Sequence, residues 1–320
     1  MKCLVLALTC LPLGAAWGGP GSDEPRGAPQ ADSTRIAGLR ALFAADALHT
    51  AQIGKLGPVE GIAGSLLGDA LYLADGIGIV QGKEDIRAAL RAANPDAAPT
   101  TLKRALAGGD ASADGRFGFT FGWLERSSAG TATAHGTYVS TWARPDARGP
   151  FRVTAYYTRA SQAPRSPIRE GFPLLAGGTG AGGVPHPDGL EAQRRSLLSA
   201  DGAFAALSVA QDLSRAFSTY AAGLVMPFGR DFSFLLGKQE VVDFYRSKPG
   251  QVLSWTPLFA GSSESGDLGF TVGTAVDTVP HPDGKVERFP SKYLTLWARQ
   301  ADGTWRFVAD GGSATPGPSP

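Results

Sequence analysis

Histidine and serine side chains often bind metals or act as nucleophiles, but they show no catalytic spacing in this sequence. The four histidines lie far apart and form neither an H-x-x-x-H nor an H-x-H pattern, so nothing local predicts a metal site. They are His49, His135, His186 and His281. The segment 261–265 (GSSES) lacks the closing glycine of a serine nucleophile elbow. We therefore expect no bound metal, no cofactor and no serine nucleophile.

The N-terminal segment indicates export. Lys2 is followed by a short apolar run and then by small residues up to Gly18, a pattern typical of a secretory signal peptide at 1–18 that is cleaved after Gly18. The run is shorter than the ~20 residues that cross a bilayer. Both cysteines, Cys3 and Cys10, lie in this segment. We expect a secreted or periplasmic protein whose mature chain has no integral membrane segment, disulfide or thiol nucleophile.

Composition excludes several classes of protein. Hydrophobic residues make up 43% of the 320 residues and charged residues 18%, which is typical of a globular chain. Lys and Arg number 30 against 29 Asp and Glu, a net charge of +1. This balance predicts no nucleic-acid partner and no attraction to an anionic membrane surface.

An internal repeat organises the chain. Leu42–Asp46 (LFAAD) recurs 155 residues later as Leu197–Asp201 (LLSAD), and two further pairs keep the same offset, namely GKEDI at 82–86 with GKQEV at 237–241, and YVSTWAR at 138–144 with YLTLWAR at 293–299. A fourth pair, GFTFG at 118–122 and GFTVG at 269–273, is offset by 151 residues. The common order of four matches indicates a duplicated domain.

The repeat predicts the limits of the domains. The copies span 35–159 and 190–313, with mobile ends at 19–34 and 314–320. The segment 160–189 between them is rich in Pro and Gly and is expected to be a linker. It contains a G-x-G-x-x-G pattern at 178–183, but Val184-Pro185-His186-Pro187 follows where a dinucleotide-binding site needs a helix. No dinucleotide site is therefore expected.

Each copy places helices before strands. In copy two, apolar residues of 197–220 follow helical spacing, and Gly237 precedes a short predicted helix at 238–246, whose partner in copy one is 83–91. The period then changes to two, with predicted hairpin turns at 282–284 and 301–303. This order predicts an α+β fold of two tandem domains, each with about three helices on one face of a curved, mainly antiparallel sheet.

Three motifs of copy two resemble a known family. They are SGDLGFTVG at 265–273, KYLTLW at 292–297, and DGTWRF at 302–307 followed by Asp310. They are similar to the SnoaL-like group of the nuclear transport factor 2-like superfamily, which includes ketosteroid isomerase. Copy one matches more weakly, with Tyr156 in place of Asp310. The resemblance implies a cone of about three helices wrapped by a bent sheet, with an apolar pocket at its mouth. It implies no single reaction, because members include enzymes and binding proteins.

The resemblance also implies where a catalytic base would lie, on the strand before the glycine that opens the third helix. In copy one this places Asp75 as the candidate base, with Tyr72 near it. Ketosteroid isomerase, a documented case of such chemistry, uses an Asp base with a Tyr and a neutral Asp. The alternative is that Asp75-Gly76 forms a turn, because Asp-Gly is a strong turn signal.

Copy two supplies the candidate ligand-binding residues of the implied pocket, and these are Arg230, Trp255, Tyr293 and Asp310. An arginine can hold an acidic ligand through paired hydrogen bonds. The alternating stripe Tyr293, Thr295, Trp297, with its counterpart at 138–142, either lines the pocket or packs against another sheet. Superfamily members often dimerise through this sheet, so the two copies are predicted to form an internal pseudo-dimer, and further self-association stays open.

The sequence therefore leaves three functions open. The first is an exported module that binds a small, mainly apolar ligand in a cone pocket. The second is an isomerase or lyase that uses a pocket Asp as general base on a carbon acid. The third is a structural or protein-interaction module. An open pocket with a buried carboxylate of raised pKa favours the second function, whereas a pocket filled by its own side chains favours the third.

Overall fold

A computed structural model describes residues 28–94, 100–128, 133–161, 189–227 and 236–315. The predicted signal peptide, most of the predicted linker and Arg230 lie outside these residues. We call residues 28–161 the first half and residues 189–315 the second half. Each half contains helices and one six-stranded sheet. The predicted α+β fold class is confirmed, and the two similar halves are compatible with the predicted two-domain arrangement.

The first half begins with a long helix that enters the segment predicted to be mobile. Its elements are α1 (Ala28–Ala63), β1 (Leu66–Leu73), β2 (Val80–Gln81), α2 (Lys83–Ala93), β3 (Thr100–Ala111), β4 (Phe117–Ser128), β5 (Ala134–Ala143) and β6 (Arg152–Ser161). Helix α1 is broken at Gly57, which has φ 78° and precedes Pro58. Glycine tolerates this left-handed conformation, and the residue before a proline avoids the helical region. The break produces two helical pieces, so the first half has three with α2.

The second half repeats this order with separate helices. Its elements are α3 (Gly189–Ala210), α4 (Leu213–Tyr220), β7 (Ala221–Pro227), β8 (Leu236–Gly237), α5 (Lys238–Arg246), β9 (Val252–Ser262), β10 (Leu268–Pro280), β11 (Val286–Arg299) and β12 (Trp305–Ala314). Asp212 begins α4 by accepting a hydrogen bond from the Arg215 N–H at 2.8 Å. The predicted helix at 238–246 and the two predicted hairpin turns are confirmed, with φ 83° at Gly284 and 81° at Gly303.

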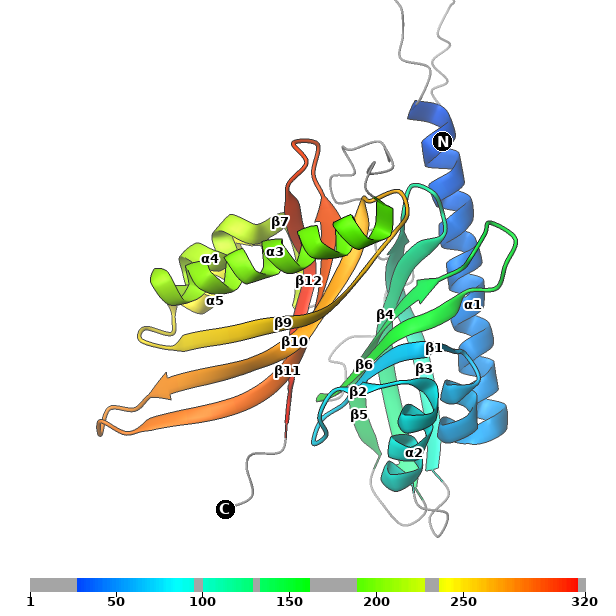
Figure 1. Ribbon diagram of the computed structural model, residues 1–320. Helices are drawn as coiled ribbons and strands as arrows, with labels where there is room; N and C mark the ends of the chain where they lie inside the picture. Colours follow the sequence, from blue (N-terminus) through cyan, green and yellow to red (C-terminus); the bar gives the residue numbers. More distant parts are fainter. Residues whose placement is uncertain (1–27, 95–99, 129–132, 162–188, 228–235, 316–320) are drawn as a thin grey trace, which may run out of the picture.

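The two sheets have the same topology. Their strand orders are β2-β1-β6-β5-β4-β3 and β8-β7-β12-β11-β10-β9. One pair in each sheet is parallel, β1 with β6 and β7 with β12, and the others are antiparallel. Figure 1 shows the helices on the outer side of each half, with the two sheets facing one another between them.

Alternation along the strands divides each sheet into two buried faces. Tyr138 and Trp142 on β5 lie in the cluster that packs against α1, whereas Val139 between them lies in a cluster shared by both sheets. In the second half, Trp297 packs with the helices and Leu294 and Leu296 join the shared cluster. The tyrosine–tryptophan stripe therefore faces the helices of its own half.

We call the shared cluster the intersheet cluster. It includes Leu71, Leu73, Phe117, Phe119, Phe121, Val139 and Tyr157 from the first half and Leu268, Phe270, Val272, Leu294, Leu296 and Val308 from the second half. The rings of Phe117 and Phe270 stack across the contact with 6.3 Å between centroids. Burial of so many large apolar side chains is the main force that holds the two sheets together.

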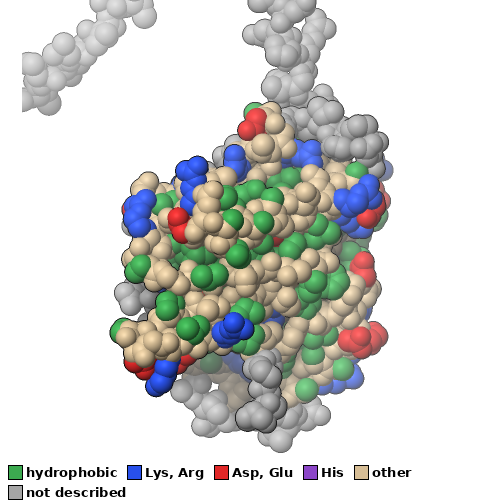
Figure 2. Space-filling view, turned by 60° about the vertical axis from the view of Figure 1, so that its left-hand side comes forward, with side chains coloured by type: hydrophobic (Ala, Val, Ile, Leu, Met, Phe, Trp, Pro, Cys, Tyr) green, Lys and Arg blue, Asp and Glu red, His purple; other side chains and the backbone are tan. Residues whose placement is uncertain are grey.

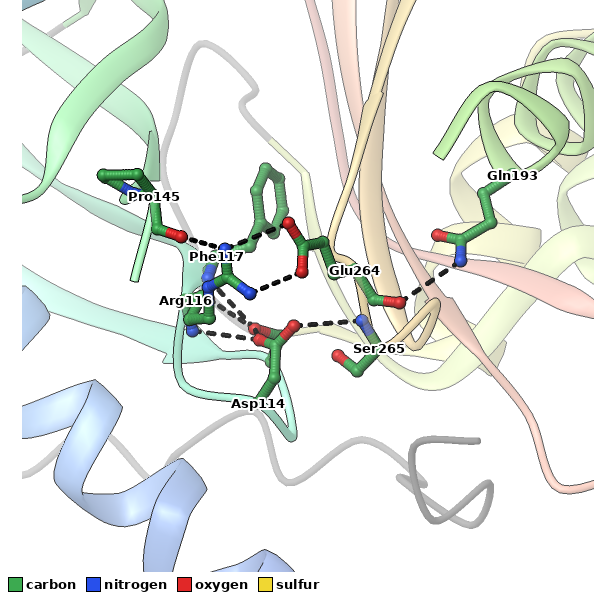
Figure 3. A network of polar contacts seen from close by, with 8 residues as sticks. Asp114, Arg116, Phe117, Pro145, Gln193, Glu264 and Ser265 are labelled. Atoms are coloured by element: carbon green, nitrogen blue, oxygen red, sulfur yellow. Dashed lines mark hydrogen bonds and ion pairs between the residues drawn. The ribbon is translucent and has the colours of Figure 1, made fainter. Parts of the chain in front are cut away.

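Polar contacts between two equivalent turns border this cluster (Figure 3). Asp114 lies between β3 and β4, and its carboxylate accepts a hydrogen bond from the Ser265 N–H at 3.0 Å. Asp267 likewise accepts from the Ala113 N–H at 2.9 Å, and Arg116 pairs with Glu264. By the 151-residue offset, Ala113 corresponds to Glu264 and Arg116 to Asp267. The Ala113–Asp267 contact and the Arg116–Glu264 contact are thus exchanged by the repeat, as paired contacts are in an isologous interface.

Figure 2 shows the surface of the second half. Hydrophobic side chains are spread over this surface, and most charged side chains lie toward its margins. Large hydrophobic residues exposed in the second half are Val209, Phe244, Val252, Leu258, Val286 and Phe289. These side chains are separate from the buried intersheet cluster. Among the described helices, none is both long and apolar enough to cross a membrane.

Candidate functional site

Each half presents one aspartate from the buried face of its first helix. Leu42, Asp46, His49 and Ile53 in α1 are buried and follow the i, i+4, i+7, i+11 spacing of one helix face. The corresponding buried residues of α3 are Leu197, Asp201, Phe204 and Ser208. Asp46 and Asp201 therefore occupy equivalent places and point from the helix toward the sheet of their own half.

In the second half, Asp201 is held by three donors. Trp255 Nε1 donates to its Oδ1 at 2.8 Å, Tyr293 Oη donates to its Oδ2 at 2.7 Å, and Thr271 supplies a further side-chain hydrogen bond. The Trp297 indole in turn donates to Thr271 Oγ1 at 2.8 Å. Burial raises the pKa of the Asp201 carboxyl despite these hydrogen bonds, which lower it. These contacts hold Asp201 in one orientation.

Asp310 is the second carboxylate of this half. It lies on β12 opposite Thr295 of β11, whose hydroxyl donates to its Oδ1 at 2.6 Å. The pKa of the Asp310 carboxyl is raised to about 7. Burial is the largest cause and the negative charge of Asp201 adds to it, whereas hydrogen bonds from Thr295 and the Gly311 backbone act in the opposite direction. The side chain is half-buried. A carboxyl group with this pKa is partly protonated near neutral pH and can both accept and donate a proton.

Aromatic rings pack together on the face of the second half that carries Asp201. Phe204 stacks on Phe307 at 5.4 Å between centroids and meets Trp255 edge-on at 4.6 Å and Phe217 edge-on at 4.9 Å. Trp297, Leu213 and Val241 belong to the same cluster. This apolar surrounding lowers the local dielectric response, which is why charge on Asp201 and Asp310 is costly.

The first half holds the same framework around its aspartate, with Arg104 in place of Trp255 and Tyr156 in place of Asp310. Asp46 accepts hydrogen bonds from Thr120 Oγ1 at 2.8 Å and Tyr138 Oη at 3.0 Å, as Asp201 does from Thr271 and Tyr293. Its third donor is Arg104, at 2.8 Å, where the second half has Trp255. Arg104 pairs with Leu124 on the neighbouring strand, and Trp255 pairs with the equivalent residue, Ala275. Arg104 and Trp255 therefore occupy equivalent positions in the two sheets.

The other replacement removes the titrating carboxylate. Tyr156 pairs with Ser140 in the first half, as Asp310 pairs with Thr295 in the second. Tyr156 is buried, and burial raises its pKa well above the ordinary tyrosine value, so its hydroxyl stays protonated. The first half therefore has a buried ion pair, Asp46 with Arg104, and lacks a carboxyl at the Asp310 position.

The structure separates the two residues implied as a base and its neighbour. Asp75 is exposed in a turn with Gly76 (φ 78°), and its Oδ2 accepts a hydrogen bond from the Ala160 N–H at 2.6 Å. Tyr72 is buried on the other side of the strand, where it stacks on Tyr156 at 5.9 Å. This placement matches the turn interpretation of Asp75, because an exposed, backbone-bonded carboxylate is not in the buried cluster.

Three of the four candidate ligand residues are brought together. Trp255 and Tyr293 both bind Asp201, and Asp310 lies close enough to raise the pKa of Tyr293, although burial is the larger cause. Arg230 lies outside the described residues. Asp46, Asp201 and Arg104 were not predicted from the sequence. A signal was present, because the first repeated motif ends in Asp in both copies and places that Asp on an otherwise apolar helix face.

No group of three or more His, Cys, Asp or Glu side chains with metal-binding geometry occurs among the described residues.

Comparison with known proteins adds a likeness of fold. No protein-family model matches the sequence. No curated protein matches it either. Solved structures similar to this chain include a ketosteroid isomerase-like protein, NTF2-like proteins and proteins with a cystatin-like fold.

Three of these structures give the extent of the likeness. A ketosteroid isomerase-like protein from Erwinia carotovora atroseptica SCRI1043 is 11% identical, with a TM-score of 0.33, and the match covers 39% of this chain and 97% of that chain. An NTF2-like protein of unknown function from Pseudomonas putida KT2440 is 12% identical, with a TM-score of 0.33 and coverages of 44% and 98%. An NTF-2 like protein of unknown function from Shewanella oneidensis MR-1 is 11% identical, with a TM-score of 0.32 and coverages of 38% and 97%.

Proposed function

We propose that the second half binds a small, mainly apolar molecule and that Asp310 exchanges a proton with it. The observation that carries this proposal is the Asp310 carboxyl, half-buried on an aromatic inner face with a pKa raised to about 7. An acid–base group works best when its pKa lies near the working pH. Of the functions left open by the sequence, this one has the geometry in its favour.

The two carboxylates have different roles in this proposal. Asp201 is occupied by Trp255, Tyr293 and Thr271, so it orients the site and its charge helps to raise the pKa of Asp310. Asp310 is the group that takes and returns the proton. The reaction class that suits it is isomerisation or elimination beside a carbonyl, in which the carboxylate takes a proton from carbon. The resulting acid then gives the proton to another carbon of the same molecule in an isomerisation, or to the departing group in an elimination. The first half, with Tyr156 in place of Asp310, does not take part in this step.

Proton exchange with a ketone probe tests the proposal. In D2O, the wild-type protein should accelerate loss of the α-protons of 2-tetralone, measured by proton NMR, and Asp310→Asn should slow this catalysed exchange about 100-fold or more because its amide cannot take the proton. The matched control is Asp75→Asn, which removes an exposed carboxylate and should leave the rate unchanged.

Two results would contradict the assignment to Asp310. Equal rates for wild type and Asp310→Asn would remove Asp310 from the chemistry. Loss of exchange in Asp75→Asn alone would instead restore the base that the family resemblance implied.

We also propose that the chain is exported and acts outside the cytoplasm, with its two halves as an internal pseudo-dimer. Support for export comes from the charged start, the short apolar run and the small residues before Gly18. Intact-mass measurement of the protein recovered from the periplasm or the medium should give a chain that begins after Gly18. A full-length mass with retention in the cytoplasm would contradict export.

A further inference from the structure

The outward face of the second sheet continues beyond the intersheet cluster. Val272 and Leu294 pack in that cluster from β10 and β11. Because side chains alternate along a strand, the even-numbered residues of 274–278 and 286–290 lie on the same face as these two. Figure 1 shows the β10–β11 hairpin reaching away from the first half. The first half therefore leaves this end of the face open.

Strand β9 adds a third strand to the open face. Leu253 and Trp255 pack with the helices, so the even-numbered residues of 252–256 point to the opposite side, beside β10. Val252 is 40% exposed, and Val286 at the hairpin end of β11 is 58% exposed. We call this face the outer extension, and it consists of the even-numbered residues of 252–256, 274–278 and 286–290.

The outer extension is almost free of charge. Its side chains are valine, serine, threonine and proline, with Arg288 as the one charged group among them. A sheet face that is exposed to water normally carries polar and charged side chains along its strands. An exposed face of mainly apolar and β-branched side chains instead favours contact with another protein surface.

The first half carries charged or titratable groups at the equivalent places. Cross-strand neighbours on the outward faces of β3, β4 and β5 are Lys103, Glu125 and His135. Their counterparts by the repeat, which are cross-strand neighbours on β9, β10 and β11, are Ser254, Val276 and Pro290. Lys103 and Glu125 are exposed. The same framework thus has a solvated row in the first half and an uncharged row in the second.

We propose that the outer extension binds the outer extension of a second copy of this chain, in a two-fold symmetric contact. Continuity with the intersheet cluster selects this partner, because the same face of β10 and β11 already packs against a sheet of this fold. In a two-fold contact the uncharged row meets its own copy, so no charge is buried without a partner. Arg288 pairs with Thr278 toward the hairpin tip, where its charge stays in water at the rim.

The contact is small, so the dimer is expected to be reversible. Strands about 4.8 Å apart, with residues about 3.3 Å apart along each strand, give a three-stranded patch of roughly a few hundred Å². A standard protein interface covers about 800 Å² per partner. We therefore expect dissociation in the micromolar range or weaker, and a proportion of dimer that rises with protein concentration.

Sedimentation equilibrium of the full mature chain from about 5 to 500 µM tests the proposal. Wild type should pass from monomer toward dimer over this range. Val276→Glu and Ser254→Lys introduce the residues of the first half, and each should weaken dimerisation about tenfold or more because it places an unpaired charge in the contact. Val209→Glu is the matched control, because Val209 is an exposed valine on α3 outside the outer extension, and this variant should dimerise like wild type.

The outcomes either support or overturn this contact. A concentration-dependent dimer that both outer-extension variants weaken, and that Val209→Glu keeps, supports it. A monomer at every concentration would overturn it, as would a dimer that Val276→Glu and Ser254→Lys leave unchanged. Association beyond the dimer would show a head-to-tail contact and overturn the two-fold pairing. Ser254 is exposed, so Ser254→Lys keeps the test available if Val276→Glu fails to fold.

Discussion

Asp46→Asn is expected to destabilise the protein by about 3 kcal/mol or more, because it leaves the Arg104 cation buried without a counter-charge. The Arg104 side chain has no solvent exposure, and Asp46 is its ion-pair partner at 2.8 Å. Asparagine has nearly the same shape as aspartate, so the loss reports on charge rather than on packing. Urea unfolding at pH 7 measures the change in the free energy of unfolding.

Asp201→Asn is the matched control, because the repeat places Asp201 in the same framework without a cation. Its donors are the neutral Trp255, Tyr293 and Thr271, and burial raises the pKa of its carboxyl. Neutralising this carboxylate should cost about 1 kcal/mol or less. Equal losses in the two variants would show that the Asp46–Arg104 charges do not stabilise the first half.

The fold was predictable from the sequence because its signals are local and occur twice. The repeat placed both sheets in one topology, and Asp-Gly turns at 283–284 and 302–303 identified two hairpins of the second half. The start of α1 at Ala28 was missed, because the segment 19–34 is rich in Gly and Pro near its beginning. It was also not predicted which face of each sheet packs against the other sheet. Alternating side chains show that a strand has two different faces, but they do not show what each face contacts.

The candidate site was only partly predictable, because its residues meet through strand register. Trp255, Tyr293 and Asp310 were predicted to line one pocket. Trp255 and Tyr293 donate to Asp201, and the charge of Asp201 helps to raise the pKa of Asp310. Asp201 itself was missed, since one aspartate on an apolar helix face has no local motif. Arg104 was missed for a similar reason, because its equivalence to Trp255 becomes visible only when β3 and β9 are aligned through their partner strands.

Asp310→Asn is expected to stabilise the protein at pH 8 and to have little effect at pH 4. The folded-state pKa of Asp310 is raised to about 7 from an ordinary value of 3.8. Below pH 4 the carboxyl is protonated in both the folded and unfolded states. Between pH 4 and pH 7 the folded state retains a proton that the unfolded state releases, so stability falls as pH rises through this window.

The size of this effect follows from the pKa shift. A shift of about three units corresponds to about 4 kcal/mol for a fully buried group, and the partial exposure of Asp310 reduces the expectation to about 2 kcal/mol. Urea unfolding of wild type and Asp310→Asn at pH 4, 6 and 8 measures the difference. His49, whose lowered pKa makes stability fall as pH drops below 6.5, is present in both proteins and cancels from that difference.

A pH-independent difference between the two proteins would show that Asp310 has an ordinary pKa, and would remove the observation on which proton exchange depends. A difference that grows between pH 4 and pH 8 would show that the Asp310 carboxyl makes the wild-type protein less stable near neutral pH than the Asp310→Asn variant. In natural proteins, residues that reduce stability in this way occur mainly where activity requires them. The stability measurement and the 2-tetralone exchange would then assign the same proton to the same carboxyl.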